Sequence, residues 1–236
     1  MDIPGEFMMA VYIFLSFINV WASSSDRKWI PFCITKPILM LVLIGVYVTN
    51  SSSVLLCVVL ALFFAWLGDV LLLDGVIRMG RNAKPGLNYA QSNLVLGGFA
   101  FIICHLFYIW TFNQIGSSQN EWPLYGIVML VYMIVGKLFY DCYIRDFLDL
   151  DNFIKWGIGL YEFAILIMSS SSVLIIKGNE LYTFVPFIGS LFFLLSDYLL
   201  ALGYKMKNAF IYHPWVMASY LTAQFLIIAG LVLSGY

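Results

Sequence analysis

The stretch that decides the fold is residues 63–75, FFAWLGDVLLLDG, and a similar stretch follows at residues 192–203, FFLLSDYLLALG. Each places one carboxylate, Asp69 or Asp197, in an apolar run that is long enough to cross a bilayer. An ionisable side chain at membrane depth is costly, so it is rare unless it carries a proton, an ion or a reaction. The two stretches therefore indicate a membrane protein whose chemistry involves a pair of buried acids.

The composition of the whole chain supports the membrane class. Of the 236 residues, 62% are hydrophobic and 11% are charged, and the mean hydropathy is +0.92. Soluble domains carry about 25% charged residues. A net charge of −1 argues against a nucleic-acid partner, which would require a basic surface. The four cysteines lie in or beside apolar runs without the spacing of a disulfide framework, so we expect them to be free.

Eight apolar segments predict eight transmembrane helices, at about 20 residues for each crossing. The runs are continuously apolar rather than alternating, which excludes membrane strands. The connections are short and polar, so we expect residues 1–236 to form a single transmembrane domain, an all-α polytopic helix bundle. The predicted helices lie near residues 7–22, 30–48, 54–73, 94–112, 123–140, 157–176, 182–203 and 214–233.

The basic residues test this helix count independently. Nine of the twelve lysines and arginines fall in the odd-numbered loops, and Lys177 alone falls in an even-numbered loop. Because basic residues collect in cytoplasmic loops, we expect both termini on the non-cytoplasmic side. The acidic start MDIPGEF lacks the basic residues of a secretory signal, so we expect no cleavage there. A multi-pass protein of this kind is expected in the endoplasmic reticulum membrane of a eukaryote or the inner membrane of a bacterium.

The ionisable residues within the spans gather on one side of the membrane. With this orientation Lys36, Asp69, Glu162 and Asp197 all fall in the cytoplasmic half, and His105 lies near mid-membrane. Scattered polar residues would not sort in this way, so we expect one cavity that opens to the cytoplasmic leaflet. A small residue precedes each Asp, which allows a neighbouring helix or a ligand to come close.

Two interpretations of the Asp pair remain open from the residues alone. In the first, each Asp is a structural partner that neutralises Lys36 or Lys137 inside the bundle. In the second, two carboxylates in one apolar site hold a single proton between them, and this division supplies a general acid and a general base. Lys36, beside Pro37, has three possible roles: a lysine that snorkels to the headgroups, a cation for a headgroup phosphate, or the partner of an Asp.

Further polar residues line the expected inner faces of two helices. His105 and Tyr108 share a helix face, and either bundle packing or a functional role would explain them. Polar packing or cavity lining would explain a stripe of residues on one face of the last helix. The stripe contains His213, Met217, Tyr220 and Gln224. With two histidines in the chain and no HxxxH or HExxH pair, we expect no metal and no other cofactor.

Together these residues resemble the YhhN-like lysoplasmalogenase family of eight-span membrane proteins. The resemblance extends in order over nearly the whole chain, although each motif alone is short. The matching positions are Lys36, Pro37, Gly68, Asp69, His105, Tyr108, Tyr161, Ser196, Asp197, Ala201, Met217, Ser219, Tyr220, Ala223 and Gln224. Glu162 has no counterpart in this pattern and is given no role.

The resemblance implies hydrolysis of the vinyl ether bond of lysoplasmalogens, with either an ethanolamine or a choline headgroup, to a fatty aldehyde and a glycerophospho-base. It implies a lysophospholipid substrate drawn from the surrounding bilayer. Asp69 and Asp197 would form the catalytic acid–base pair, and Lys36 would meet the phosphate. Supporting or substrate-binding roles would fall to His105, Tyr108, Tyr161, Ser196, Tyr220 and Gln224.

Two other functions use the same buried carboxylates. A proton-coupled transporter or a lipid-binding membrane protein would use them as proton carriers, but a transporter would place polar residues in both halves of the membrane. Another membrane lipid hydrolase, such as a metal-dependent amidase, would need the histidines that this chain lacks. The confinement of the ionisable groups to one half favours a site that is open on one side.

Overall fold

The computed structural model describes most of the chain, and every statement below concerns these residues. They are residues 3–25, 28–80, 87–116, 122–139, 141, 152–177, 180–205 and 209–236. No strand occurs among them. The predicted all-α class is therefore confirmed for the described part of the chain.

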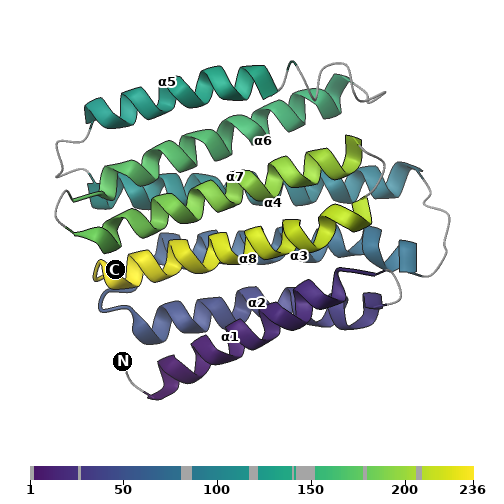
Figure 1. Ribbon diagram of the computed structural model, residues 1–236, viewed down its shortest axis with the longest axis horizontal. Coiled ribbons are helices and arrows are strands. Elements are labelled where there is room, and N and C mark those ends of the chain that lie inside the picture. The colour runs from purple at the N-terminus through teal and green to yellow at the C-terminus, as the bar shows by residue number, and fades with distance from the viewer. Residues whose placement is uncertain are drawn as a thin grey trace.

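Eight α-helices, with two short 3-10 helices near the C-terminal half, build the molecule. The α-helices are α1 (Ile3–Ala22), α2 (Trp29–Asn50), α3 (Leu56–Gly80), α4 (Leu87–Gly116), α5 (Trp122–Phe139), α6 (Asn152–Ser171), α7 (Val185–Lys205) and α8 (Ala209–Leu233). The 3-10 helices are η3 (Ser172–Ile175) and η4 (Leu181–Phe184). Both lie between α6 and α7, so they belong to one connection at one end of the bundle (Figure 1).

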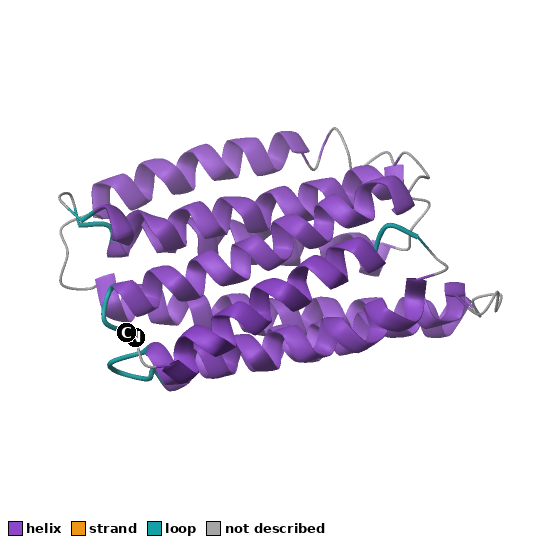
Figure 2. Ribbon diagram, turned by 60° about the horizontal axis from the view of Figure 1, so that its bottom comes forward, coloured by secondary structure: helices purple, strands orange, loops and turns teal. Residues whose placement is uncertain are grey.

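The helices run side by side along the long axis of the molecule and reverse direction at each connection (Figure 1). α1 begins and α8 ends at the same end of the bundle, as a second view also shows (Figure 2). The closest partners are α7 with α8, α3 with α4, and α1 with α2. α5 lies at the edge and packs chiefly against α6.

Seven of these helices are long and apolar enough to span a membrane, which makes the chain a multi-pass membrane protein. The helix that falls short is α5, whose apolar part is Pro123–Leu138. α5 nevertheless runs alongside α6 in the bundle (Figure 1). The count of eight crossings and the orientation of the termini therefore stay predictions.

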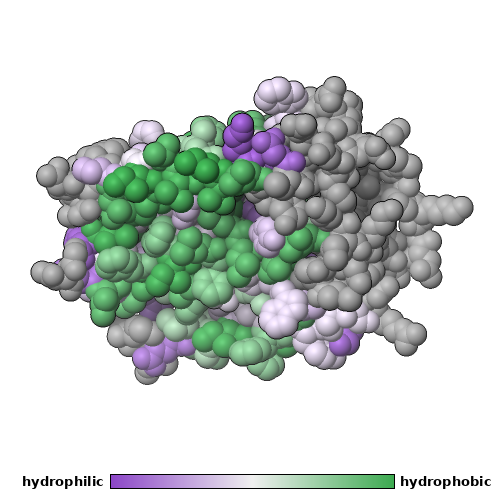
Figure 3. Space-filling view, turned by 45° about the horizontal axis from the view of Figure 1, so that its top comes forward, coloured by the Kyte–Doolittle hydropathy of each residue, from purple (hydrophilic) through white to green (hydrophobic). Residues whose placement is uncertain are grey.

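Large apolar side chains cover much of the outside of the bundle. Phe7, Phe17, Trp110 and Leu130 are each more than 60% exposed. The described part of the face in Figure 3 is largely apolar. Monomeric soluble proteins rarely expose apolar patches of this extent. The outer surface is thus suited to lipid, and the buried core lies between the helices.

Several helices continue beyond the apolar segments that predicted them. α3 reaches Gly80 although its apolar window ends at Leu73, and α4 already begins at Leu87. Apolar content marks the part of a helix that lies in hydrocarbon, but backbone hydrogen bonding continues into the polar residues that follow. The predicted ranges near 54–73 and 94–112 therefore mark shorter segments than the helices themselves.

Small residues next to the two Asp residues allow close helix contacts, as the sequence predicted. A Cβ atom on Gly68 would lie 2.7 Å from the Phe101 ring of α4, too close for any real side chain. Ser196 is buried and donates a hydrogen bond of 3.1 Å to the carbonyl oxygen of Val216 on α8. Each Asp thus follows a residue that fixes how closely the next helix approaches.

Buried serines join α6 to α7 far from either Asp. The hydroxyls of Ser169 and Ser190 lie 2.7 Å apart, and Ser169 also donates to Tyr132 of α5 at 3.1 Å. Both serines are fully buried. Hydroxyl bonds of this kind are typical of helix pairs in membranes, where they fix the contact between two helices.

Candidate active site

Asp69 is held by residues from two other helices. The Lys36 Nζ of α2 lies 3.1 Å from Asp69 Oδ1, and the Tyr220 hydroxyl of α8 donates to Asp69 Oδ2 at 2.9 Å. All three side chains are buried, with Lys36 8% and Asp69 1% exposed. Because each carboxylate oxygen accepts from a separate donor, the contacts of Asp69 are those of an ionised carboxylate.

This ion pair answers the question that the sequence left open about Lys36. Of its three possible roles, the structure supports the partner of an Asp, since the ammonium is turned inward onto Asp69. Lys137, the other candidate partner, is instead exposed on α5. Within the described residues, Lys36–Asp69 is the one ion pair.

Asp197 has a different setting on α7. Tyr161 of α6 donates a hydrogen bond of 2.8 Å to Asp197 Oδ2. The Asp197 side chain is half-buried rather than fully buried, and no cation is paired with it among the described residues. The acidic neighbour Glu162 lies close enough to interact electrostatically with Asp197. Asp197 therefore has one phenol where Asp69 has a phenol and an ammonium.

Aromatic rings connect the surroundings of the two acids. The His105 ring of α4 lies 5.6 Å from the Tyr161 ring and 5.0 Å from the Phe193 ring, measured between centroids. Phe193 in turn meets the Tyr220 ring edge-on at 5.4 Å. Ring contacts thus form a continuous path from the phenol on Asp197 to the phenol on Asp69. The two carboxylates are not hydrogen-bonded to each other, and each has its own tyrosine.

His105 lies in this path with no hydrogen-bond partner. The side chain is fully buried, and neither Nδ1 nor Nε2 has a donor or an acceptor within reach. A buried polar group without a partner costs about 1–3 kcal/mol. Such a group in a native fold calls for a reason, and a role in chemistry is one of them. Both nitrogen atoms of the imidazole are therefore without a hydrogen-bond partner.

Two more of the predicted residues, Tyr108 and Gln224, form a hydrogen bond with each other. The Tyr108 hydroxyl of α4 donates to Gln224 Oε1 of α8 at 2.8 Å, and both side chains are fully buried. Tyr108 lies one turn from His105 on α4, and Gln224 lies one turn from Tyr220 on α8. This bond ties together the two helices that carry His105 and Tyr220. Ser196 reaches the α8 backbone and touches neither acid.

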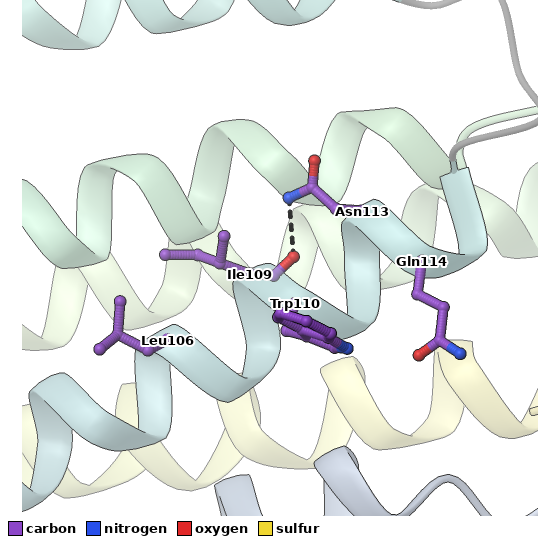
Figure 4. Close-up of a pocket in the computed structure, with 5 residues that line it drawn as sticks. All are labelled: Leu106, Ile109, Trp110, Asn113 and Gln114. Atoms are coloured by element: carbon purple, nitrogen blue, oxygen red, sulfur yellow. Dashed lines mark hydrogen bonds between the residues drawn. The ribbon is translucent and has the colours of Figure 1, made fainter.

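Two cavities in the described part of the chain lie away from the two acids. A groove of about 650 Å³ lies on the outer face of α4, lined by Leu106, Ile109, Trp110, Asn113 and Gln114 (Figure 4). A second cavity, of about 210 Å³, lies between α5 and α6. Asp69 and Asp197 line neither of them. The expected opening to the cytoplasmic leaflet therefore stays a prediction.

The sequence reasoning missed the aromatic partners of the site. The Phe193 ring meets the His105 and Tyr220 rings edge-on, and Phe101 meets the Tyr220 ring at 6.0 Å. Phe193 lies one turn before Asp197 on the same helix face, so helical spacing could have identified it. No comparable signal marks Phe101 among the many phenylalanines of the chain. Among the described residues, no group of three His, Cys, Asp or Glu side chains lies close enough to hold a metal ion.

Comparison with known proteins adds one finding to this geometry. The model of the YhhN family matches residues 32–231, which is most of the chain. The matched region contains every residue of the site described above. Neither the curated proteins nor the solved structures gave a match.

Proposed function

Since the chain belongs to the YhhN family, we propose that it is a lysoplasmalogenase, a membrane enzyme that hydrolyses the vinyl ether bond of a lysoplasmalogen. The single observation that carries the proposal is the unpartnered, fully buried His105 between two carboxylates with different surroundings. Hydrolysis of this bond needs an acid, a base and one water molecule at the same place. The two Asp residues and His105 supply a group for each.

Hydrolysis of a vinyl ether needs one group that donates a proton and one group that accepts a proton. The slow step is transfer of a proton to the alkene carbon that lies away from the oxygen, which leaves an oxocarbenium ion. Water then adds to the cationic carbon and loses a proton to a base. The resulting hemiacetal collapses to a fatty aldehyde and the glycerophospho-base. Paired carboxylates act in a similar way on the oxocarbenium-like transition states of glycosidases.

We assign the acid role to Asp197 and the base role to Asp69. Asp197 accepts one hydrogen bond from a phenol and has no paired cation, so it is the carboxyl that can hold the proton to be transferred. Asp69 is paired with Lys36, so it serves as the carboxylate that stabilises the cation and accepts the proton of water. Tyr161 and Tyr220 hold the two carboxyl groups in place.

His105 then positions the attacking water. A neutral imidazole can donate from one nitrogen and accept at the other, so it can orient water between the two carboxyl groups. Tyr108 and Gln224 fix the helices that carry His105 and Tyr220, through their hydrogen bond of 2.8 Å. The apolar rings around the site keep bulk water away from the oxocarbenium ion.

The test is to incubate the purified protein in detergent with a lysoplasmalogen and to measure the released aldehyde. We expect turnover of the vinyl ether and none of the matching saturated alkyl ether, which cannot be protonated to an oxocarbenium ion. The rate should fall as pH rises, because the acid must carry its proton, and it should fall in D₂O, because proton transfer to carbon limits the reaction. Activity should survive strong chelators. A rate that is flat between about pH 5 and 9, with no solvent isotope effect, would contradict acid catalysis by a carboxyl group.

A further inference from the structure

A cavity between α5 and α6 is lined by one basic and one acidic side chain. The cavity has a volume of about 210 Å³, and Lys137 of α5 and Glu162 of α6 line it, together with Gly136, Gly159 and three apolar side chains. Lys137 plays no part in the site described above, whereas Glu162 is the acidic neighbour of Asp197. Both are at least partly accessible, since Lys137 is exposed and Glu162 half-buried.

The two charges face the same cavity without pairing with each other. No ion pair between Lys137 and an acidic residue occurs in the described part of the chain. Space for the Glu162 carboxylate comes from Gly136, where a Cβ atom would lie 3.4 Å from Glu162 Oε1 and 2.6 Å from a methyl carbon of Leu166. A side chain at position 136 would therefore close the part of the cavity beside the carboxylate.

The position of the cavity suits the headgroup of a lipid. Lys137 lies in the last turn of α5, at the end of the bundle where α1, α3 and α7 also end. A membrane places its phosphates and amines at the ends of the spanning helices and its acyl chains along their apolar sides. Pockets for whole drug-sized ligands occupy roughly 300–1,000 Å³. A cavity of about 210 Å³ therefore suits a headgroup whose acyl chain remains in the bilayer.

We propose that this cavity binds the zwitterionic headgroup of a single-chain glycerophospholipid, with Lys137 on the phosphate and Glu162 on the amine. Lys36, the other lysine of the membrane-spanning part, is engaged by Asp69 and is not available for a phosphate. The assignment of the lipid as substrate rests on the proposed function, whereas recognition of the headgroup is a matter of binding alone.

The sequence position of Glu162 connects this cavity to Asp197. Glu162 follows Tyr161, the residue whose hydroxyl donates to Asp197. Successive residues of a helix point about 100° apart, so the two side chains face neighbouring sides of α6. Glu162 also lies within electrostatic reach of Asp197. A headgroup held at Glu162 would place the glycerol backbone near the acid on the other side of one helix.

The experiment measures binding of saturated ether lipids, which the proposed reaction cannot consume. The probes are hexadecyl glycerophosphoethanolamine, the amine-free hexadecyl glycerophosphate, and the headgroup-free hexadecyl glycerol. Their dissociation constants are measured on the purified full-length protein in detergent. Soluble phosphoethanolamine serves as a competitor, which separates a lipid site from a site for a free phosphate compound. We expect it to compete poorly, because it lacks the chain that stays in the apolar phase.

Two variants remove one charge each and keep the size of the side chain nearly constant. Glu162→Gln should weaken binding of the ethanolamine lipid about tenfold, the loss of one charge-assisted hydrogen bond, and should leave the amine-free lipid unaffected. Lys137→Met should weaken both phosphate-bearing lipids to a similar extent and leave hexadecyl glycerol unaffected. Glu6→Gln and Lys177→Met are the matched controls, since both residues lie outside the cavity.

The possible outcomes separate this proposal from the proposed reaction. Equal affinity of wild type and both variants for all three lipids would overturn the headgroup site, even if aldehyde were released from a lysoplasmalogen. The expected binding pattern without any aldehyde would support the headgroup site and reject the reaction. Strong competition by phosphoethanolamine would overturn the lipid as the ligand. If Glu162→Gln lowers the yield of folded protein, Glu162→Asp keeps the charge and should retain the preference for the amine.

Discussion

The surroundings of Asp69 and Asp197 differ although the local sequences match. Asp69 on α3 is 1% exposed and receives an ammonium and a phenol, whereas Asp197 on α7 is half-buried and receives a phenol. In both cases the phenol comes from another helix. What differs is the second neighbour: Lys36 of α2 lies on Asp69, and the acidic Glu162 lies near Asp197. A cation beside one acid and an anion beside the other gives two identical side chains different chemistry.

The comparison shows how a bundle can assign two roles to one residue type. Pairing with an ammonium favours the charged form of a carboxyl group, and an anionic neighbour favours the neutral form. Enzymes that need both a general acid and a general base often obtain them from two carboxyl groups with unlike neighbours. We therefore treat the difference between the two Asp environments as the centre of the mechanism, and the following predictions test it.

The largest effect is expected from removing the titratable group of either acid. Asp69→Asn and Asp197→Asn keep the shape of the side chain, and each should lower aldehyde release by roughly 10²–10⁴-fold, the usual contribution of a general acid or base. The measurement is turnover of lysoplasmalogen by equal amounts of folded protein. Asp141→Asn, at a described acid outside the site, is the control and should keep its activity. A variant at position 69 or 197 with half of the wild-type rate would exclude that residue from proton transfer.

Substitution of the two acids should lower the stability of the protein to different extents, although both substitutions should abolish activity. Removing one partner of a buried ion pair costs about 3–5 kcal/mol, because the other charge is left without compensation. Asp69→Leu or Lys36→Met should therefore lower the melting temperature in detergent strongly. The double variant should recover most of the loss, since an apolar pair replaces the ion pair. Asp197→Leu, which leaves no cation behind, should have a smaller effect.

Equal melting temperatures for Asp69→Leu and Asp197→Leu would contradict this difference. A double variant that is less stable than either single variant would also count against the pair, because it would mean that the two residues contribute independently.

The smallest effect is expected at the two phenols. Tyr161→Phe removes the hydrogen bond to Asp197 and should lower kcat about tenfold, whereas Tyr220→Phe leaves Lys36 on Asp69 and should lower kcat only two- to threefold, as for single hydrogen bonds of unequal importance. The measurement is kcat at saturating substrate, with Tyr125→Phe on α5 as a comparison outside the site. A reversed order would mean that the phenol on Asp69 matters more than the phenol on Asp197, in spite of the ion pair on Asp69.

The helices and the inward position of their charged residues are predictable from the sequence, because hydrocarbon tolerates few other backbone structures and few unpaired charges. Continuous apolar runs predict helices, and a charged residue within such a run must face a partner inside the bundle. On these grounds Asp69 and Tyr220 are expected inside the bundle, whereas Lys36 could equally extend to the headgroups. The structure places all three in contact. The family match over residues 32–231 confirms the resemblance that the motifs indicated.

The remaining features depend on contacts between helices that no local pattern specifies. From the residues alone, Lys36 and Lys137 are equal candidates to pair with Asp69, because both lie in apolar helices. The separation of the two acids by the rings of His105 and Phe193 likewise depends on how α4 and α7 approach each other. Helix ends were uncertain too, since polar residues continue α3 past the apolar segment.

The serine contact between α6 and α7 has a consequence for the spacing of the active site. Ser169 follows Tyr161 by about two turns of α6, and Ser190 precedes Asp197 by about two turns of α7. Since the two helices run in opposite directions, the Ser169–Ser190 and Tyr161–Asp197 bonds act as two fixed points at a set separation. One inserted residue between the points on α6 alone would shift one bond by about 1.5 Å and turn it by about 100°. The number of residues between these two bonds therefore determines where the Tyr161 hydroxyl meets Asp197.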